Sequence, residues 1–189
     1  MRMIGFVFAA LMAIAMPASA VEMGDDGLHK PTWLEDTFLD VREDLTEAEA
    51  QGKRLLIIWE QRGCIYCNKM HNEVFPNPEI DAMIRENFYV VQMNLFGDIE
   101  VTDLDGTVMS ERDMAGRWGV IFTPTMMFMR DGEAGQVMGT EFAAATMPGA
   151  FGKYTTRHLM EWIVQKGYDG DEPFQKYHAR MLQERGVIE

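Results

Sequence analysis

Leu55-Leu56-Ile57-Ile58-Trp59 forms an unbroken apolar run, and Gly63-Cys64-Ile65-Tyr66-Cys67 follows it after three further residues. These two cysteines are the only ones among 189 residues. A buried strand that leads into a C-x-x-C at the first turn of a helix is the usual architecture of a dithiol redox site. Because the helix dipole favours an anion at this position, we expect Cys64 to ionise near neutral pH, with Cys67 one turn away.

The first twenty residues predict where this chemistry takes place. Arg2 provides a basic start, residues 4–15 form an apolar core too short to span a bilayer, and Ala18-Ser19-Ala20 is a cleavage signal. We therefore expect a secretory signal peptide over residues 1–20 and a mature protein in the periplasm, with no membrane insertion after cleavage. The alternative, an uncleaved anchor, would need about 20 apolar residues, whereas Pro17 and Glu22 interrupt the run. An exported chain whose only cysteines form a C-x-x-C has no structural disulfide, so the pair is expected to cycle between dithiol and disulfide.

The remaining residues, 21–189, are enough for one domain with a sizeable core. The whole chain has a net charge of −13, and removal of residues 1–20, in which Arg2 is the only charged residue, makes it −14. Such a charge repels nucleic acid and anionic membrane surfaces, so neither is an expected partner. No internal repeat or low-complexity tract is present.

Hydrophobic periodicity predicts alternating helices and strands. Helices are expected where apolar residues recur at helical spacing, over residues 34–52, 64–74, 77–87, a short segment after Ser110, 159–167 and a last segment after Pro173. Strands are expected at 55–59, 89–95, 125–129 and around Val137, with a small hairpin at 101–108 that turns at Asp105-Gly106. The order β-α-β-α-β-β-α, with an extra helix at each end, predicts a mixed sheet covered on both faces.

The chain resembles the thioredoxin superfamily through Cys64-x-x-Cys67, the strand before it and Thr123-Pro124. More narrowly, it resembles the SoxW-type periplasmic thioredoxins associated with bacterial sulfur-oxidation operons. The shared features are Gly63-Cys64-x-Tyr66-Cys67, His71, the insert at 97–106, Ser110-Glu111 and 122–125. The resemblance implies an α/β thioredoxin fold with a small β-hairpin insert and extra N- and C-terminal helices. In one thioredoxin-like domain over 21–189, the core is expected at about 34–167 and a C-terminal helical extension at 168–189.

Each motif residue has an expected role. Cys64, at the exposed helix start, is expected to be the attacking thiolate, and Cys67, buried one turn further in, the resolving thiol. The pairing of an upstream C-x-x-C with Thr-Pro suggests that Pro124 follows a cis peptide bond and faces the dithiol. Thr123 would then offer its backbone to an extended substrate segment. Tyr66 is expected at the rim of the site, unless it simply packs against neighbours.

The sequence departs from typical thioredoxins at positions that affect the redox potential. Gly63 stands where those proteins have tryptophan, Ile65-Tyr66 where they have Gly-Pro, and Ile58 where they have a buried aspartate. Glu60 lies on the same strand face as Ile58, since side chains alternate with a period of two, and could supply the missing base. The alternative is that Glu60 is a surface acid at the strand end.

Metal binding is the main competing interpretation. Cys64, Cys67 and His71 share a helix face and could be three ligands, but no fourth is evident, and a cis-proline beside the dithiol would take the space of a metal. The methionines within Met126-Met127-Phe128-Met129 could suggest copper, although their place in an apolar strand favours core packing. We therefore expect no metal and no cofactor.

These observations predict a periplasmic thiol-disulfide oxidoreductase, acting as a reductase of protein disulfides and connected with sulfur oxidation. A disulfide oxidase or isomerase, or a carrier of copper or another thiophilic metal, remains an alternative. The expected partners are a protein disulfide substrate and, as the resemblance implies, a membrane thiol transporter of the CcdA/DsbD type as electron donor. The protein is expected to be a monomer.

Overall fold

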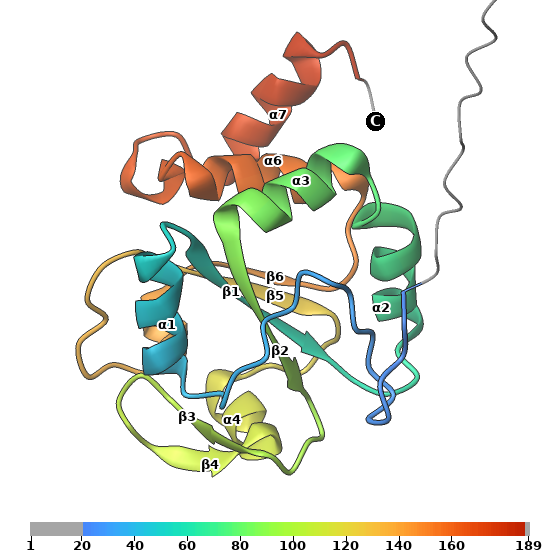
Figure 1. Cartoon of the computed structure of the whole chain (residues 1–189). Helices are drawn as coiled ribbons and strands as arrows, with labels where there is room; N and C mark the ends of the chain where they lie inside the picture. Colours follow the sequence, from blue (N-terminus) through green and yellow to red (C-terminus); the bar gives the residue numbers. More distant parts are fainter. Residues whose placement is uncertain (1–20, 188–189) are drawn as a thin grey trace, which may run out of the picture.

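A four-stranded mixed sheet forms the centre of the molecule in the computed structural model, which describes residues 21–187 (Figure 1). Its strands, in the order β2-β1-β5-β6, are β2 (Phe88–Asn94), β1 (Arg54–Glu60), β5 (Thr125–Met129) and β6 (Ala143–Pro148). β1 pairs parallel with β2 and antiparallel with β5, and β5 is also antiparallel to β6. The predicted signal peptide, residues 1–20, lies outside the described residues.

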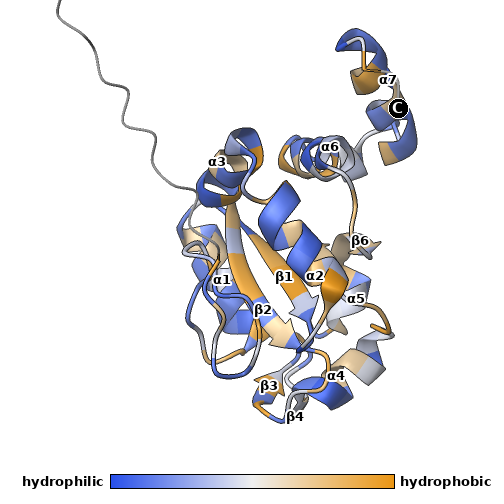
Figure 2. Ribbon diagram, turned by 90° about the vertical axis from the view of Figure 1, so that its right-hand side faces the viewer, coloured by the Kyte–Doolittle hydropathy of each residue, from blue (hydrophilic) through white to orange (hydrophobic). Residues whose placement is uncertain are grey.

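Helices cover both faces of this sheet, as predicted. α3 (Pro78–Asn87) and α6 (Lys153–Val164) pack on one face, and α1 (Val41–Ala50) and α4 (Glu111–Trp118) pack on the other. β1 is buried on both faces because it lies inside the sheet, and its apolar run supplies Leu56 and Ile58 to one core and its remaining apolar residues to the other. The apolar colouring of β1 and β2 between the helices is visible in Figure 2.

The helix that carries the C-x-x-C has two parts. α2 (Ile65–Lys69) continues into a π-helical turn, η1 (Met70–Val74), so the helix ends where the sequence predicts. Its buried side chains are Cys67, Met70, His71 and Val74. Asn77 then caps α3 by accepting hydrogen bonds from the backbone N–H groups of Glu79 and Ile80, with Pro78 in the first turn.

The predicted hairpin is present beside the main sheet. β3 (Glu100–Thr102) and β4 (Val108–Ser110) pair antiparallel. Gly106 has a φ of +83°, a conformation that glycine adopts without steric cost, which explains the Asp-Gly sequence in the connection. Ser110 caps α4 by accepting a hydrogen bond from the Asp113 N–H, also as predicted.

The N-terminal helix is shorter than the apolar spacing suggests, so the prediction of a helix from Leu34 is wrong. α1 begins at Val41, after Asp40 accepts a hydrogen bond from the backbone N–H of Arg42. Leu34 instead forms a parallel bridge with Val90 at the edge of β2, and Phe38 is exposed. Pairing with an edge strand offers the segment backbone hydrogen bonds that an extended chain can use, so the helical spacing of its apolar residues is incidental.

The partner strand of β5 is also displaced from its predicted position around Val137. Residues 130–138 form a loop, a short helix α5 (Gly139–Phe142) follows, and β6 begins only at Ala143. The buried carboxylate of Asp103 accepts a hydrogen bond from the Gly139 N–H and so fixes the start of α5. This contact joins residues 36 positions apart and has no local sequence signal.

The C-terminal part follows the prediction. α6 is followed by a 3₁₀ turn, η2 (Gly167–Asp169), and by α7 (Phe174–Glu184), which packs against α6 through Tyr177. Within residues 21–187, none of the helices has the length and apolar character needed to cross a bilayer.

Candidate redox site

The two cysteines form a disulfide at the start of α2. Their Cα atoms lie 5.2 Å apart. Gly63, with a φ of +73°, turns the chain from β1 into the helix, and Cys64 is the N-cap residue whose Sγ accepts a hydrogen bond from the Cys67 N–H at 3.0 Å. Cys64 is 8% exposed and Cys67 is 0% exposed. Cys64 is less exposed than the sequence suggests, but of the two cysteines only Cys64 keeps any exposed surface.

The Thr123-Pro124 loop lies against this disulfide. The peptide bond is cis, as predicted from the sequence. The Thr123 hydroxyl donates a hydrogen bond to Cys64 Sγ at 3.3 Å, so the loop contacts the sulfur of the first cysteine directly. The loop is held by the Thr125 hydroxyl, which donates to the Phe122 carbonyl at 2.8 Å at the start of β5.

Large apolar side chains are exposed on both segments that meet at the disulfide. Ile65 and Tyr66 follow Cys64 on α2, while Ile121 and Phe122 precede the Thr123-Pro124 loop. Each of the four is more than half exposed, Tyr66 at 58% and Phe122 at 60%. Tyr66 therefore lies at the rim, and we refer to these four residues as the apolar rim. Exposed apolar groups that gather around a reactive pair are typical of a surface that binds a partner.

Glu60 is completely buried, which excludes its interpretation as a surface acid. It lies at the end of β1, where one carboxylate oxygen, Oε1, is 2.5 Å from His71 Nε2. The other oxygen, Oε2, lies 3.3 Å from His29 Nδ1 and accepts a hydrogen bond from Gln92 Nε2 at 3.1 Å. A buried carboxylate needs partners of this kind because burial without them is costly. Ile58, two residues earlier, is an ordinary core residue.

The two histidines bonded to Glu60 are stacked on each other. The ring centroids of His29 and His71 are 4.2 Å apart with an interplanar angle of 13°, and Trp33 lies nearly parallel to His71 at 6.1 Å. We refer to His29, Glu60 and His71 as the buried triad. His71, which the sequence grouped with the cysteines as a possible metal ligand, is thus directed to Glu60 instead.

Among the described residues, the buried triad is a group whose ligand atoms all lie within 4.8 Å of one another, and a His₂Glu set can bind zinc. An imidazole binds a metal ion close to the plane of its ring. Two nearly parallel stacked rings cannot both place one ion in their planes, so this arrangement favours hydrogen bonding and proton sharing over metal binding.

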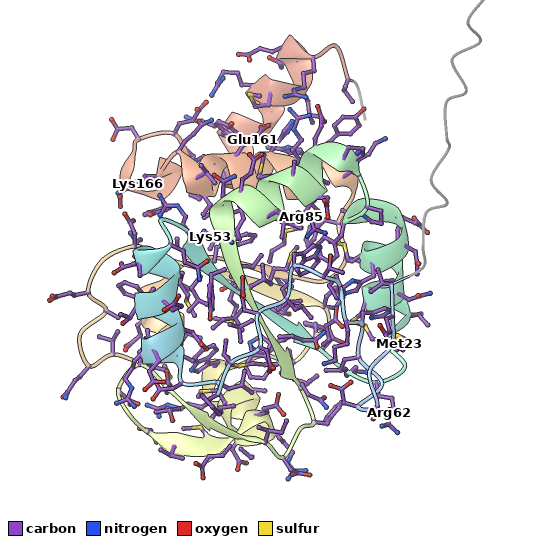
Figure 3. The ribbon with its side chains drawn as sticks, in the orientation of Figure 1. Met23, Lys53, Arg62, Arg85, Glu161 and Lys166 are labelled. Atoms are coloured by element: carbon purple, nitrogen blue, oxygen red, sulfur yellow. A yellow bond between two sulfur atoms is a disulfide. The ribbon has the colours of Figure 1, made fainter. Side chains whose placement is uncertain are left out.

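His29 belongs to an N-terminal segment, residues 21–39, that sequence reasoning did not connect with the site. Gln92 Nε2 donates to the His29 carbonyl at 2.8 Å, and the Glu35 N–H donates to the Val90 carbonyl at 2.9 Å. Arg62, two residues before Cys64, donates to the carbonyl of Asp26 at 3.2 Å, and Figure 3 shows Met23 and Arg62 at the same corner of the molecule. No motif marks His29, and only its approach to Glu60 reveals its place.

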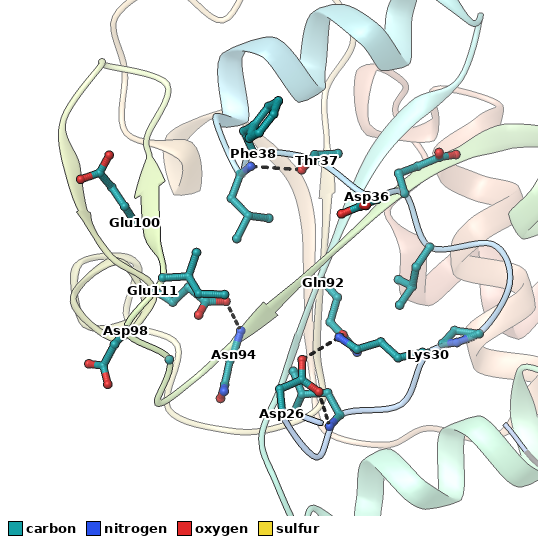
Figure 4. Close-up of a pocket in the computed structure, with 17 residues that line it drawn as sticks. Asp26, Lys30, Asp36, Thr37, Phe38, Gln92, Asn94, Asp98, Glu100 and Glu111 are labelled. Carbon is teal, nitrogen blue, oxygen red and sulfur yellow. Dashed lines mark hydrogen bonds and ion pairs between the residues drawn. The ribbon is translucent and has the colours of Figure 1, made fainter. Parts of the chain in front are cut away.

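A groove of about 900 Å³ lies between this N-terminal segment and the hairpin, and neither cysteine lines it. Glu111 is buried at its base and accepts a hydrogen bond from the Asn94 N–H at 2.7 Å (Figure 4). Burial raises the pKa of Glu111 above its ordinary value. The charged residues that line the groove are carboxylates except for Lys30, and the groove is separate from the redox pair.

Residues 41–147 match the family of thioredoxin-like domains. No curated protein sequence matches the chain. Among solved structures, a thioredoxin-fold protein from Helicobacter pylori is 20% identical, with 70% of this chain and 81% of that chain covered at a TM-score of 0.50. A thioredoxin from Thermus thermophilus is 20% identical, with 68% and 86% covered at a TM-score of 0.52. Since the family match spans more than half of the 189 residues and the sheet and helices have the arrangement of the thioredoxin fold, the chain belongs to the thioredoxin-like domain family.

Proposed function

We propose that this protein is a periplasmic thiol-disulfide oxidoreductase that reduces disulfides in other proteins. The observation that carries the proposal is the Cys64–Cys67 disulfide at a helix start, in which only Cys64 keeps exposed surface and its sulfur contacts Thr123. The Cys67 N–H and the Thr123 hydroxyl both donate hydrogen bonds to Cys64 Sγ. These donors stabilise a thiolate, the form in which cysteine attacks a disulfide.

The reaction begins with the reduced protein. The Cys64 thiolate attacks one sulfur of the substrate disulfide, forms a mixed disulfide and releases the other substrate sulfur as a thiolate. The Cys67 thiol then loses its proton and attacks Cys64 Sγ, which breaks the mixed disulfide and releases the second substrate thiolate. Two electrons pass from the dithiol to the substrate, and the protein is left with the Cys64–Cys67 disulfide seen in the structure.

The apolar rim indicates the kind of substrate. An extended, partly apolar segment next to the substrate cysteine would cover Tyr66 and Phe122, and the backbone of Thr123 would pair with it in the manner of a short β-strand. A small disulfide would contact Cys64 without these groups. We therefore propose a protein disulfide as the substrate.

The periplasmic location rests on the signal-peptide pattern of residues 1–20, and the connection with sulfur oxidation rests on the resemblance to SoxW-type proteins. A reductase in an oxidising compartment must be supplied with electrons, because disulfide formation is favoured there. We propose a membrane thiol transporter of the CcdA/DsbD type as the donor.

The experiment is a measurement of the Cys64–Cys67 reduction potential together with an insulin reduction assay on mature protein. A potential near the roughly −270 mV of thioredoxin and catalytic insulin reduction would support the reductase. A potential near roughly −120 mV with net disulfide formation in a reduced substrate would instead assign an oxidase. A Cys64→Ser, Cys67→Ser double variant is the control, and activity retained in it would contradict both.

A further inference from the structure

We propose that the groove between the N-terminal segment and the β3–β4 hairpin binds an extended, basic segment of a partner protein, which pairs with the outer edge of β2. This is the groove of about 900 Å³ that neither cysteine lines, so the inference is independent of the proposed function. The segment would lie as a short added strand, with apolar side chains against the groove walls and lysine or arginine side chains beside the carboxylates.

The outer edge of β2 is only partly covered. β2 is the last strand on its side of the sheet, and the bridge between Leu34 and Val90 pairs it with the N-terminal segment. Backbone groups of a strand alternate between its two sides, and the Leu95 N–H donates to the Glu60 carbonyl of β1, so Val90 and Gln92 both face outward. Within residues 21–187, no strand or bridge pairs with Gln92 on this outward side. Gln92 therefore offers its backbone to an added strand.

Exposed apolar side chains line the groove beside this edge. Phe38, in the N-terminal segment, is 94% exposed, and Ile99, just before β3, is 63% exposed. Figure 4 shows Phe38 across the groove from Glu100 and Glu111. Water around such apolar groups is released when a partner covers them, so the walls favour a segment that also carries apolar side chains.

The charges of the groove determine which segment fits. Its ionisable side chains are six carboxylates and one amine, from Asp26, Glu35, Asp36, Asp98, Glu100, Glu111 and Lys30. Three of the carboxylates form ion pairs with basic residues of this chain. Asp36, Glu100 and Glu111 form no ion pair within residues 21–187. A basic segment would supply the missing positive charges, whereas an acidic one would be repelled.

Glu111 lies where the added strand would continue past Gln92. It is 3% exposed, and its Oε1 accepts a hydrogen bond from the Asn94 N–H at the end of β2. A Cβ at Gly97 would collide with Glu111 Oε2, so glycine is needed there to leave room for the carboxylate. Burial raises the pKa of Glu111 above its ordinary value, and a lysine ammonium beside it would favour the charged form.

The test measures fluorescence anisotropy of a labelled peptide, Gly-Lys-Val-Lys-Val-Lys-Val-Gly, with the mature protein. The peptide contains no cysteine, so the result does not depend on whether the protein is a reductase. We expect saturable binding that weakens at least tenfold between 50 and 500 mM NaCl, because salt screens the charges. The counterpart with glutamate in place of lysine should not bind. Equal binding of the two peptides would overturn the proposal.

Backbone pairing is tested with two N-methylated forms of the lysine peptide, one methylated at its lysines and the other at its valines. Only alternate N–H groups of a strand face the neighbouring strand, so one form should bind at least tenfold more weakly than the other. Equal affinities of the two forms would show that the peptide does not pair with β2 and would overturn the proposal.

Two double variants separate the groove from the general negative charge of the protein. Asp36→Asn with Glu100→Gln removes two exposed groove carboxylates and should raise the dissociation constant of the lysine peptide at least fivefold. Glu73→Gln with Glu133→Gln removes two exposed carboxylates outside the groove and is the matched control. Phe38→Ser should also weaken binding. Equal weakening by both double variants would assign the binding to net charge alone and overturn the proposal.

The wild-type protein locates the peptide without any variant. Changes in the ¹H–¹⁵N spectrum on addition of the lysine peptide should gather at Gln92, Asn94 and Gly97. Changes gathered at Tyr66 and Phe122 would place the peptide on the apolar rim and overturn the proposal. Sedimentation of the protein alone tests another occupant. A dimer that dissociates in Phe38→Ser would assign the groove to a second copy of this chain and would also overturn it.

Discussion

The hydroxyl of Thr123 donates a hydrogen bond to Cys64 Sγ at 3.3 Å, although the two residues are 59 positions apart in the chain. The sulfur also accepts the Cys67 N–H at 3.0 Å. One donor comes from the helix that carries the cysteine, and the other comes from the loop before β5. The reactivity of Cys64 therefore depends on the docking of two segments and not on the C-x-x-C alone.

Replacement of Thr123 by valine should slow attack by Cys64 at neutral pH. Valine keeps the shape of the side chain but removes the donor, and a hydrogen bond to a charged group contributes about 1.5–3 kcal/mol. We expect a roughly tenfold slower reaction with 5,5′-dithiobis(2-nitrobenzoate) at pH 6.5 and near-equal rates at pH 9.5. Thr146→Val, at an exposed position of β6, is the control. Unchanged rates at pH 6.5 would show that the hydroxyl does not support the thiolate.

The two cysteines should differ in their ability to trap a substrate. Cys64 keeps 8% exposure and Cys67 keeps none, so only Cys64 is placed to attack a protein disulfide. Cys67→Ser should accumulate a mixed disulfide with insulin, visible on a non-reducing gel and cleaved by dithiothreitol. Cys64→Ser should accumulate none. Trapping by Cys64→Ser and not by Cys67→Ser would reverse the assigned roles.

The apolar rim should matter for protein substrates and not for small ones. Phe122 is 60% exposed, and loss of its buried contact with a partner costs about 1.4 kcal/mol, which corresponds to a tenfold change. Phe122→Ser should raise the KM for insulin by about this factor and leave the reaction with 5,5′-dithiobis(2-nitrobenzoate) unchanged. Phe38→Ser, at a 94% exposed position of the N-terminal segment, serves as the control. An equal effect of both serine variants on the KM would contradict a specific role for the rim.

Stability should depend on pH through Asp44 in α1. Desolvation raises the pKa of this buried carboxyl to about 7, and the charges of Asp40 and Glu43 add to the effect. An unfolded chain releases the proton near pH 4, so between about pH 4 and 7 the folded state holds a proton that the unfolded state lacks. The free energy of unfolding should therefore fall as pH rises, by up to about 1.4 kcal/mol per pH unit, and level off above about pH 7.

The variant Asp44→Asn removes this titration. Urea unfolding at pH 5 and pH 8 should show a smaller loss of stability between the two values in the variant than in the wild type. Asp113→Asn, at an exposed position of α4, is the comparison because it also lies in the first turn of a helix. An equal loss in wild type and Asp44→Asn would mean that Asp44 does not titrate in this range.

Local sequence was sufficient for the elements whose signals lie within a few residues. The run Leu55–Trp59 predicts a buried strand because apolar residues on both faces require neighbours on both sides. Asn77-Pro78 and Ser110 predict helix starts for local reasons. The Asn77 and Ser110 side chains can accept hydrogen bonds from the N–H groups of the first turn, and the fixed φ of Pro78 suits the first helical position. The C-x-x-C and Thr123-Pro124 predict the redox pair and its cis loop, and the structure places them in contact.

Tertiary structure decided the features that depend on residues far apart in the chain. Leu34 pairs with Val90 instead of joining a helix, and Asp103 fixes the start of α5, which moves the last strand past Val137. The residues next to Glu60 in the sequence do not show whether its side chain is exposed or buried. In the folded protein His29 and His71 contact its two carboxylate oxygens, and these contacts accompany its burial. The sequence by itself determined the strand, the helix starts and the reactive pair, because periodicity and capping act within one or two turns. A carboxylate can be buried only where other groups form hydrogen bonds or ion pairs with it, and these groups come from distant parts of the chain. For Glu60 they become available when the N-terminal segment packs against β1 and η1.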